Sequence, residues 1–425
     1  MTTYNSVSNE KKRKQIYKGD WLWQTGYYAK TKRKGGRGMI EGWEYKKLGD
    51  VCQVVTGSTP KTNISEYWDG NYPWVTPAEL KGDVYISDTA RHITEEAIAH
   101  TNLTLLPIGT VLLSSRAPIG KVAITTIEMY CNQGFKNLIC SDAINNKYLY
   151  LWLSGKTEYL NSLGRGATFK EISKTIVENV IIPLPPLSIQ KSIVTELDKI
   201  NELIRLKKEQ LKDYDNLAQS IFYEMFGDPV VNEKGWDIES LGKVCDVRDG
   251  THDSPQYLQE SPYILITSKN LVNGKIDYSN VNYISKEDYI AINKRSQVDD
   301  GDIIMAMIGT IGNPIIVKLE EHKFCIKNVA LIKFFNDSLV SNKYVHSLLN
   351  NESYLTFIKS QNKGGTQKFV ALGTIRKLPI PIPPLSYQQQ FIQRIELIEK
   401  QKAEVQRTIK DLETLLASRM QYWFD

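Results

Sequence analysis

Apolar residues recur with an alternating spacing of four and three in two long segments, which predicts two amphipathic helices. One segment runs from Ser188 to Phe226 and the other from Ser386 to Phe424, and neither contains a glycine or a proline. Each segment of about 39 residues would form a helix about 58 Å long. Because this spacing is typical of coiled coils, we expect the two helices to pair with each other, most simply antiparallel. Pairing between two molecules is the alternative.

The segments ahead of each helix have a different pattern. Short runs rich in β-branched residues, separated by glycine and proline, predict the strands of a mixed α/β globule. A proline run follows each globule, at 183–188 and at 381–386. Proline suits neither a strand nor a helix interior, so we expect these runs to end the globules, with Ser188 and Ser386 as helix N-caps.

The chain contains two copies of one module. "WEYKKLGDVC" at 43–52 returns as "WDIESLGKVC" at 236–245, and "IIPLPPLSIQ" at 181–190 returns as "PIPIPPLSYQ" at 379–388. The duplication predicts an α/β (α+β) fold with two similar globules, two long antiparallel helices and pseudo-two-fold symmetry. The expected divisions are a basic N-terminal extension (1–42), a first globule (43–185), a central helix (186–230), a second globule (231–383) and a C-terminal helix (384–425).

Composition narrows the class of protein. Of 425 residues, 41% are hydrophobic and 24% are charged, which is typical of globular chains. No segment approaches the roughly 18–20 uninterrupted apolar residues of a membrane span, so we expect no membrane association. The five cysteines include no CxxC pair, which favours reduced thiols in a cytoplasmic protein.

The net charge of +5 is unevenly distributed. Residues 1–42 hold ten Lys and Arg against three Asp and Glu, whereas the rest of the chain holds 43 against 45. The body is therefore nearly neutral. If it binds nucleic acid, it must do so through local basic patches or beside partners that supply positive charge.

Signatures of catalysis are absent from the sequence. It contains no P-loop, no HExxH, no GxSxG and no zinc-finger spacing, and its five histidines are scattered. We therefore expect a binding protein with no catalytic residue, no metal and no cofactor of its own.

Several motifs in their order and duplication resemble the DNA-specificity subunit of type I restriction–modification systems. They are "TGSTPKT", "PWVTPAEL", "SSRAPIGKVAI", "NQGFKNL", "GATFKEISK" and the "IPLPPLSIQ" that precedes the first long helix. The resemblance covers about 43–425. It implies that each globule is a target recognition domain and that the helices are the spacers between them.

The resemblance also implies partners. Double-stranded DNA would be read as a bipartite site, with one half-site for each globule. Two methyltransferase subunits would bring S-adenosylmethionine, and two motor-nuclease subunits would bring ATP and Mg²⁺. A coiled-coil interaction scaffold without sequence-specific DNA binding is the alternative function.

Polar and basic side chains on loops punctuated by glycine and proline are the candidate DNA contacts. In the first copy they are Ser58, Thr59, Lys61, Thr76, Lys81, Ser115, Arg116, Asn132, Gln133, Lys136, Arg165, Thr168, Phe169 and Lys170. In the second copy they are Thr251, His252, Ser254, Thr267, Lys269, Lys327, Asn328, Lys363, Thr366, Gln367 and Lys368. For each of them a solvated turn residue is the alternative interpretation.

Two of these loops carry further expectations. "GRGATFK" at 164–170 places two cations around glycines, but it is equally a helix approach, with Thr168 as N-cap and Glu171 as its capping-box partner. The loop "SSRAPIG" at 114–120 differs between the two copies, because Arg116 of the first copy aligns with Ile308 of the second. We therefore expect that loop to contact bases in the first globule and only to pack in the second.

Overall fold

The computed structural model describes residues 43–166, 170–252, 254–319, 322–361 and 369–424. The chain forms two compact units. The first unit contains the residues up to Arg205 together with those from Lys410 onward, and the second contains Leu206–Ile409. Each unit therefore holds one globule and parts of both long helices.

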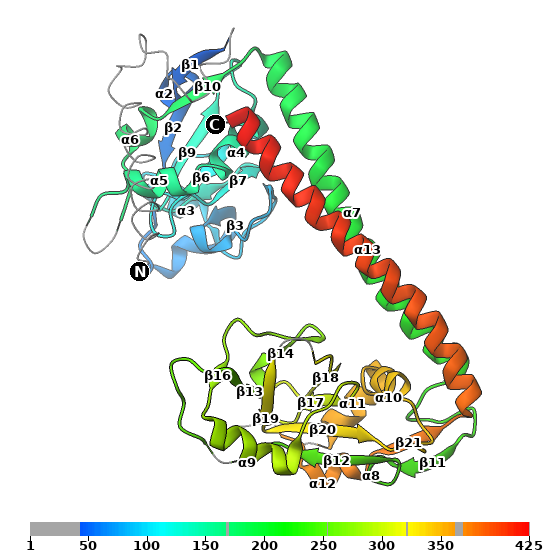
Figure 1. The fold of residues 1–425 in the computed structure, drawn as a ribbon. Coiled ribbons are helices and arrows are strands. Elements are labelled where there is room, and N and C mark those ends of the chain that lie inside the picture. Colours follow the sequence, from blue (N-terminus) through cyan, green and yellow to red (C-terminus); the bar gives the residue numbers. More distant parts are fainter. Residues whose placement is uncertain (1–42, 167–169, 253, 320–321, 362–368, 425) are drawn as a thin grey trace, which may run out of the picture. The chain divides into compact units, whose positions relative to one another are not determined.

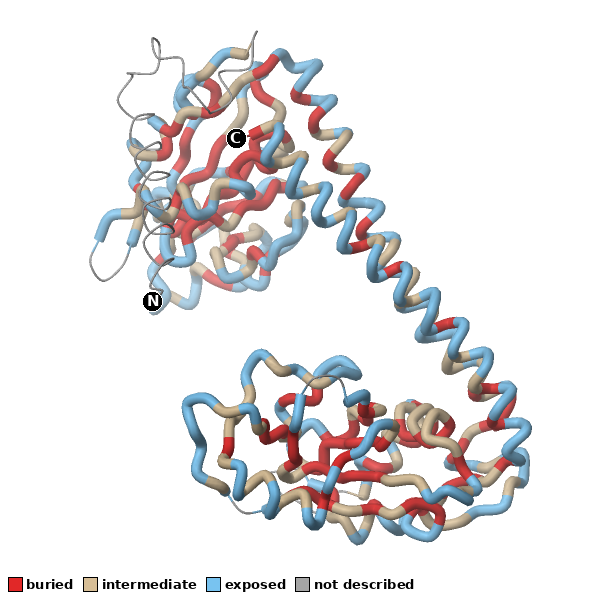
Figure 2. Tube along the Cα trace, viewed as in Figure 1, coloured by how far each residue is buried: buried red, intermediate tan, exposed pale blue. Residues whose placement is uncertain are grey.

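A five-stranded sheet forms the centre of the first globule (Figure 1). Its strands, in spatial order, are β2 (Cys52–Thr56), β9 (Lys136–Cys140), β6 (Val111–Leu113), β7 (Val122–Thr125) and β4 (Tyr85–Ile86). The helix α4 (Asn146–Ser154) packs against β6 and β7. Apolar residues of the sheet and of α4 form one continuous core, which is coloured as buried in Figure 2.

A smaller three-stranded sheet lies beside this core. It contains β5 (His92–Ile93), β3 (Trp68–Val75) and β8 (Tyr130–Cys131). Trp68 and Trp74 pack edge to face in its own apolar cluster, with ring centroids 5.1 Å apart. The Arg91 guanidinium lies 3.6 Å from the Trp68 ring centroid.

The second globule repeats this plan. Its four-stranded sheet contains β12 (Cys245–Asp249), β20 (Val329–Phe334), β17 (Ile303–Ala306) and β18 (Gly312–Ile316). Its three-stranded sheet contains β16 (Asn282–Tyr283), β13 (Tyr263–Thr267) and β19 (Lys323–Lys327), and β14 (Leu271–Val272) pairs with β15 (Lys275–Ile276). The predicted duplication of a mixed α/β globule is confirmed.

Short helices connect the strands in matching places. In the first globule they are α2 (Leu48–Val51), α3 (Glu95–His100), α5 (Thr157–Leu163) and α6 (Lys174–Glu178). In the second they are α8 (Leu241–Val244), α9 (Lys286–Ser296), α10 (Asn342–Leu349), α11 (Glu352–Ser360) and α12 (Leu372–Arg376). Three-residue 3₁₀ turns are η2 (Ser65–Tyr67), η3 (Pro77–Glu79) and η4 (Ser268–Asn270).

A two-stranded sheet joins the beginning and the end of each globule. β1 (Glu44–Lys47) pairs antiparallel with β10 (Ile181–Leu184), and β11 (Asp237–Ser240) pairs in the same way with β21 (Pro379–Ile382). The expectation that a proline run does not continue a strand is wrong here, because β10 includes Pro183 and β21 includes Pro381. A two-stranded sheet has only edge strands, and there a missing N–H can be tolerated.

Two helices of 40 residues follow the globules, α7 (Leu187–Phe226) and α13 (Leu385–Phe424). Each begins one residue earlier than expected, so Ser188 and Ser386 are not the N-caps. The first i→i−4 bond of each helix runs to the carbonyl of the proline before it, from the Gln190 N–H to Pro186 at 3.0 Å and from the Gln388 N–H to Pro384 at 3.1 Å, so both serines lie inside the helices.

Within each unit the two helices run antiparallel, as predicted (Figure 1). In the first unit, Arg419 of α13 pairs with Glu196 of α7. In the second unit, Lys402 Nζ lies 2.8 Å from the Asp215 carboxylate. The apolar seam is buried in both units, as at Ile193 and Leu197 in the first and Phe391 and Val405 in the second (Figure 2).

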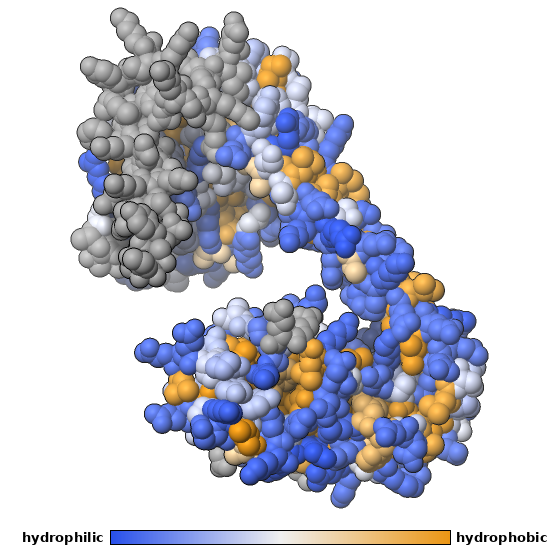
Figure 3. Space-filling model, viewed as in Figure 1, coloured by the Kyte–Doolittle hydropathy of each residue, from blue (hydrophilic) through white to orange (hydrophobic). Residues whose placement is uncertain are grey.

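The visible outer face of these helices is mostly hydrophilic but carries separate apolar patches (Figure 3). Leu203, Leu217 and Leu397 are among the exposed leucines. Among the described residues, no helix has the length and apolar character needed to cross a bilayer.

Candidate nucleic-acid interface

Loops that are distant in sequence meet at one end of the first globule. The Ser58 N–H, just after β2, donates to the carbonyl of Cys131 at 2.9 Å, and the Asn132 N–H donates to the carbonyl of Val75 at 3.1 Å. Gly57 permits this close approach, because a Cβ atom there would lie 2.1 Å from the Asn132 carbonyl oxygen. The loops that carry Ser58, Thr76 and Asn132 are thereby joined.

The loop after β6 is attached to the same group. Both the N–H and the hydroxyl of Ser115 donate to the carbonyl of Gly134, at 2.8 and 3.0 Å. The Ser115 carbonyl accepts from the Ile172 N–H at 2.9 Å. This bond connects residues 114–120 with the segment that follows the "GRGATFK" loop.

The base of the "GRGATFK" loop is closed by its backbone. Arg165 and Glu171 exchange two N–H···O hydrogen bonds of 3.0 Å. Thr168 and Phe169 lie outside the described residues. The expected helix start at Thr168 and Glu171 is wrong, because α6 begins at Lys174 with Ser173 as its N-cap. The side chain and the backbone of Glu171 are bound elsewhere, so this residue takes no part in a capping box.

Glu171 connects two cations at the centre of these loops. Its carboxylate accepts from Arg116 Nε at 2.9 Å and from Lys136 Nζ at 3.2 Å. The Lys136 side chain is only 6% exposed, whereas that of Arg116 is 49% exposed. Burial raises the pKa of the Glu171 carboxyl, but the hydrogen bonds from Lys136 and Arg116 outweigh this and hold it below its ordinary value.

The predicted contact residues of the first globule divide by exposure. Exposed residues are Lys61, Lys81, Arg116, Gln133, Arg165 and Lys170, and half-buried ones are Ser58, Thr59, Thr76 and Asn132. Ser115 and Lys136 are buried, so the prediction that they lie on the surface is wrong. Their polar atoms bind Gly134 and Glu171, so they support the loops from inside.

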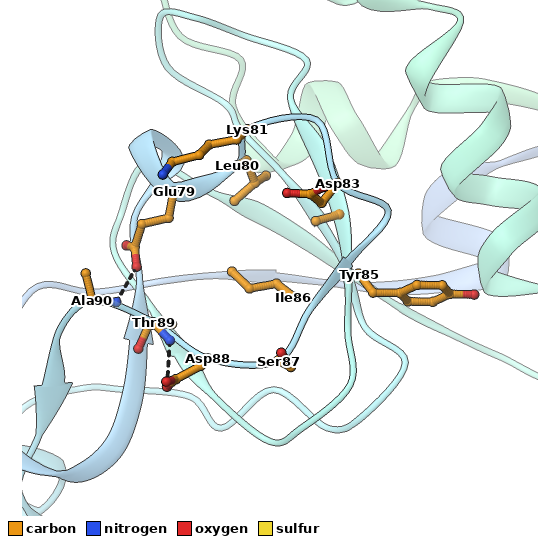
Figure 4. A pocket seen from close by; sticks show the side chains of 11 residues that line it. Glu79, Leu80, Lys81, Asp83, Tyr85, Ile86, Ser87, Asp88, Thr89 and Ala90 are labelled. Carbon is orange, nitrogen blue, oxygen red and sulfur yellow. Dashed lines mark hydrogen bonds between the residues drawn. The ribbon is translucent and has the colours of Figure 1, made fainter. Parts of the chain in front are cut away.

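A hollow of about 410 Å³ borders this loop cluster next to Lys81 (Figure 4). The Glu79 carboxylate is occupied by the backbone, accepting from the N–H groups of Thr76 and Ala90 at 2.7 Å each. Asp83 and Asp88 also line the hollow. The carboxylates of Glu79, Asp83 and Asp88 repel phosphate, so we expect the DNA-contacting surface of the first globule to end at Lys81.

The second globule brings its corresponding loops together in the same way. Gly250 replaces Gly57, and a Cβ atom on it would lie 2.2 Å from the Ile326 carbonyl oxygen. Thr251 forms a parallel bridge with Lys327, and Thr267 pairs with Lys327 on its other side. Lys327 Nζ also donates to the Ser254 hydroxyl.

Asp249, an acidic residue without a local sequence signal, connects the side chains of this cluster. The buried Asp249 carboxylate pairs with Arg295 and lies 2.7 Å from His252 Nε2. His252 Nδ1 lies 3.0 Å from the Asn328 side-chain oxygen. Thr267 is half-buried and its hydroxyl donates to Asn270, whereas Lys269 is exposed.

The two copies differ chemically at the position of Glu171. The Arg116–Glu171 backbone bridge of the first globule corresponds to an Ile308–Phe369 bridge in the second. The strand register places Ala330 where the first copy has Lys136. The ionic group of Arg116, Glu171 and Lys136 is therefore replaced by apolar side chains in the second copy. Lys363, Thr366, Gln367 and Lys368 lie outside the described residues.

Comparisons with known proteins agree with this organisation. The family of the type I restriction modification DNA specificity domain matches the chain twice, over residues 40–213 and 233–414. The MjaIX specificity subunit of a type I restriction enzyme from Methanocaldococcus jannaschii is 33% identical over 384 residues, which cover 84% of this chain and 87% of that protein. The MjaVIII specificity subunit from the same organism is 23% identical over 414 residues, covering 91% and 94%.

Solved structures show the same fold. A chain from a study of complex assembly and conformational transition in the type I restriction–modification system has a TM-score of 0.60 at 20% identity, covering 92% of this chain and 99% of its own. The S subunit from M. genitalium has a TM-score of 0.50 at 13% identity, covering 92% and 98%. With two matched domains and a 33% identical relative over most of its length, the chain belongs to the type I restriction–modification DNA specificity family.

Proposed function

We propose that this chain is the DNA-recognition subunit of a type I restriction–modification complex and that each globule reads one half of a bipartite site. The observation that carries the proposal is the duplicated cluster of loops, formed by the same elements in both globules and presented by rigid sheets. The two clusters differ in their side chains, so the two half-sites differ in sequence. A scaffold without sequence preference is not favoured, because the family is one of DNA specificity.

The chain recruits its catalytic partners and carries no chemistry of its own. Burial raises the pKa of the thiols of Cys131, Cys245 and Cys325 to about 12 each, so these cysteines are poor nucleophiles at neutral pH. Two methyltransferase subunits supply S-adenosylmethionine, and two motor-nuclease subunits supply ATP and Mg²⁺. The exposed leucines of α7 and α13, such as Leu203 and Leu397, are available for contact with these partners.

The partners also explain how a nearly neutral body binds DNA. Outside residues 1–42 the acidic residues slightly outnumber the basic ones, 45 to 43. Local cations such as Lys61, Arg165 and Lys170 contact phosphates and bases, and the partner subunits add further phosphate contacts.

Exchange of one globule tests whether each globule recognises its own half-site. Residues 43–185 are replaced with the corresponding segment of another family member, and the recognised sequence is determined in the complex with both kinds of partner. One half of the recognised site should change while the other half stays the same. A change in both halves, or in neither, would contradict the assignment of one half-site to each globule.

The length of the helices sets the spacer between the half-sites. Forty residues give a helix of about 60 Å, which corresponds to about 17–18 base pairs. Seven residues inserted after Lys207 and seven after Thr408 preserve the seam in both helices and add about 10 Å. The unread spacer should lengthen by about three base pairs. An insertion of the same residues after Gly235, outside the helices, is the control and should leave the spacer unchanged.

A further inference from the structure

We propose that Arg116 reads a guanine in the half-site of the first globule and that Glu171 is the residue that positions it. This inference rests on the proposed function and adds to it the base and the side chain that recognises it.

The ion pair with Glu171 engages only the Nε atom of Arg116. Glu171 binds the Nε atom, at 2.9 Å. Among the described residues, the two terminal nitrogens of Arg116 have no hydrogen-bond partner, and the side chain is 49% exposed. The guanidinium is thus fixed at its inner edge, with donors available to solvent at its outer edge.

Glu171 is itself held firmly in place. Its second oxygen binds Lys136, whose buried ammonium group needs a carboxylate partner because an unpaired buried charge is costly. Its backbone is bonded to Arg165 by two hydrogen bonds of 3.0 Å. Glu171 therefore stays bound to Lys136 when DNA approaches, and its carboxylate continues to hold Arg116 Nε.

A supported arginine suits a guanine. Two parallel N–H donors match the O6 and N7 acceptors that guanine presents in the major groove. An arginine that is already ordered loses less side-chain entropy when it binds. Neighbouring exposed cations, Arg165 and Lys170, are free to contact phosphates and fix the register.

The second globule provides an internal comparison. Ile308 and Phe369 occupy the positions of Arg116 and Glu171, and Ala330 occupies that of Lys136. This group has no donor, so it cannot read guanine. The inferred guanine contact therefore belongs to the first half-site alone.

The test uses the complete complex and a library of duplexes with randomised half-sites, with methylation as the readout. Exchange of residues 43–185 first identifies the half-site of the first globule. Arg116→Ala and Arg116→Lys should each lower the preference for guanine at one position of that half-site by about tenfold to a hundredfold. The other positions should be unchanged. Ile308→Ala is the matched control and should leave the whole site unchanged.

Glu171→Gln tests the positioning role. It should weaken the preference at the same guanine, by less than Arg116→Ala does, because the guanidinium remains but its inner support is reduced. If Glu171→Gln fails to fold, as judged by its melting curve, the two Arg116 variants still decide the inference.

Other outcomes would overturn the inference. A half-site without guanine would do so. So would an Arg116→Ala variant whose affinity falls equally for all sequences, with a salt slope smaller by about one, because that result identifies a phosphate contact. In both cases a bipartite site recognised by the unmodified complex would leave the proposed function standing. A complex without any preferred sequence would refute the proposed function itself.

Discussion

The buried residues Gln190 and Gln388 form the same three side-chain hydrogen bonds at corresponding places in the two units. The side-chain oxygen of Gln190 accepts from the Asn145 N–H at 2.8 Å, and its nitrogen donates to the carbonyls of Pro185 and Ala143 at 2.8 and 3.1 Å. Gln388 accepts from the Ser341 N–H at 2.8 Å and donates to the carbonyls of Pro383 and Leu339, at 2.9 Å each.

Each glutamine fixes the first turn of a long helix to its globule. Asn145 and Ser341 are the N-caps of α4 and α10, the helices that pack on the central sheets. The duplicated contact therefore sets the direction in which α7 and α13 leave their globules. The spacer length can follow the helix length only when each helix leaves its globule in a fixed direction. A buried glutamine amide with all its hydrogen-bond partners present holds that direction.

We predict that removing either amide destabilises one unit. Gln190→Met removes the side-chain partner of the Asn145 N–H and of the carbonyls of Pro185 and Ala143, which should cost about 2–4 kcal/mol of unfolding free energy in the first unit. Gln388→Met should do the same in the second unit. Denaturant unfolding of the full chain measures both effects. Gln389→Met changes an exposed neighbour and should have little effect; comparable losses for all three variants would contradict the prediction.

Gly57 should not tolerate a side chain. A Cβ atom at this position would lie 2.1 Å from a backbone oxygen, so Gly57→Ala should destabilise the first unit by about 1–3 kcal/mol. Gly373, in α12, is the matched control, because no atom lies within 4 Å of its Cβ position. Gly373→Ala should be neutral or should stabilise by up to about 1 kcal/mol. Melting curves that rank the two variants in the opposite order would show that the loop approach is wrong.

The end of α13 should contribute to the stability of the first unit. Phe424 is buried, and its ring centroid lies 5.5 Å from that of Tyr148. Phe424→Ala should therefore lower the unfolding free energy by about 3 kcal/mol. Leu415→Ala, on the same helix but exposed, should change it by less than about 0.5 kcal/mol. Equal effects in a denaturant titration would argue against docking of the helix end.

The Glu196–Arg419 pair should make stability depend on pH. Hydrogen bonds from Arg419 lower the pKa of Glu196 despite an opposing effect of burial, and the Trp423 indole N–H, at 3.1 Å, lowers it further. A carboxyl with a lowered folded-state pKa stabilises the protein above its ordinary pKa of 4.5, and this contribution disappears as the pH falls through the folded value.

The comparison of the parent with Glu196→Gln measures this contribution. The parent should be the more stable of the two at pH 6–7, and the difference should shrink below about pH 4. Asp411→Asn, at an exposed position of α13, controls for a change of net charge. A difference between parent and Glu196→Gln that stays constant from pH 3 to pH 7 would exclude the ionic contribution.

The two long helices were predictable from the sequence because their apolar residues recur with a regular spacing. The heptads of α7 and α13 gave their ends to within one residue, because the seam residues recur over many turns. Their N-caps were not predictable in the same way. Ser188 has the right chemistry for a cap, but the first i→i−4 bond already runs to the carbonyl of Pro186, so Ser188 lies inside the helix.

The loop clusters were predictable as a set of segments but not in their internal contacts. Glycine and proline in the sequence indicated which loops carry polar side chains, but the close backbone contacts at Gly57 and Gly250 appear only in the fold. The pairing of Arg295 with Asp249 joins residues 46 apart and has no local signal. Glu171 likewise suggested a helix start in its local context, and only the fold brings Arg116 and Lys136 to it.

Sequencing the modified bases of a host genome shows whether this chain selects a bipartite DNA sequence for a methylating complex. Genomes of a host that carries the partner subunits are compared with and without this gene. We expect one methylated motif, made of two different half-sites around an unread spacer, that disappears when the gene is deleted. A methylation pattern that is unchanged by the deletion would contradict it.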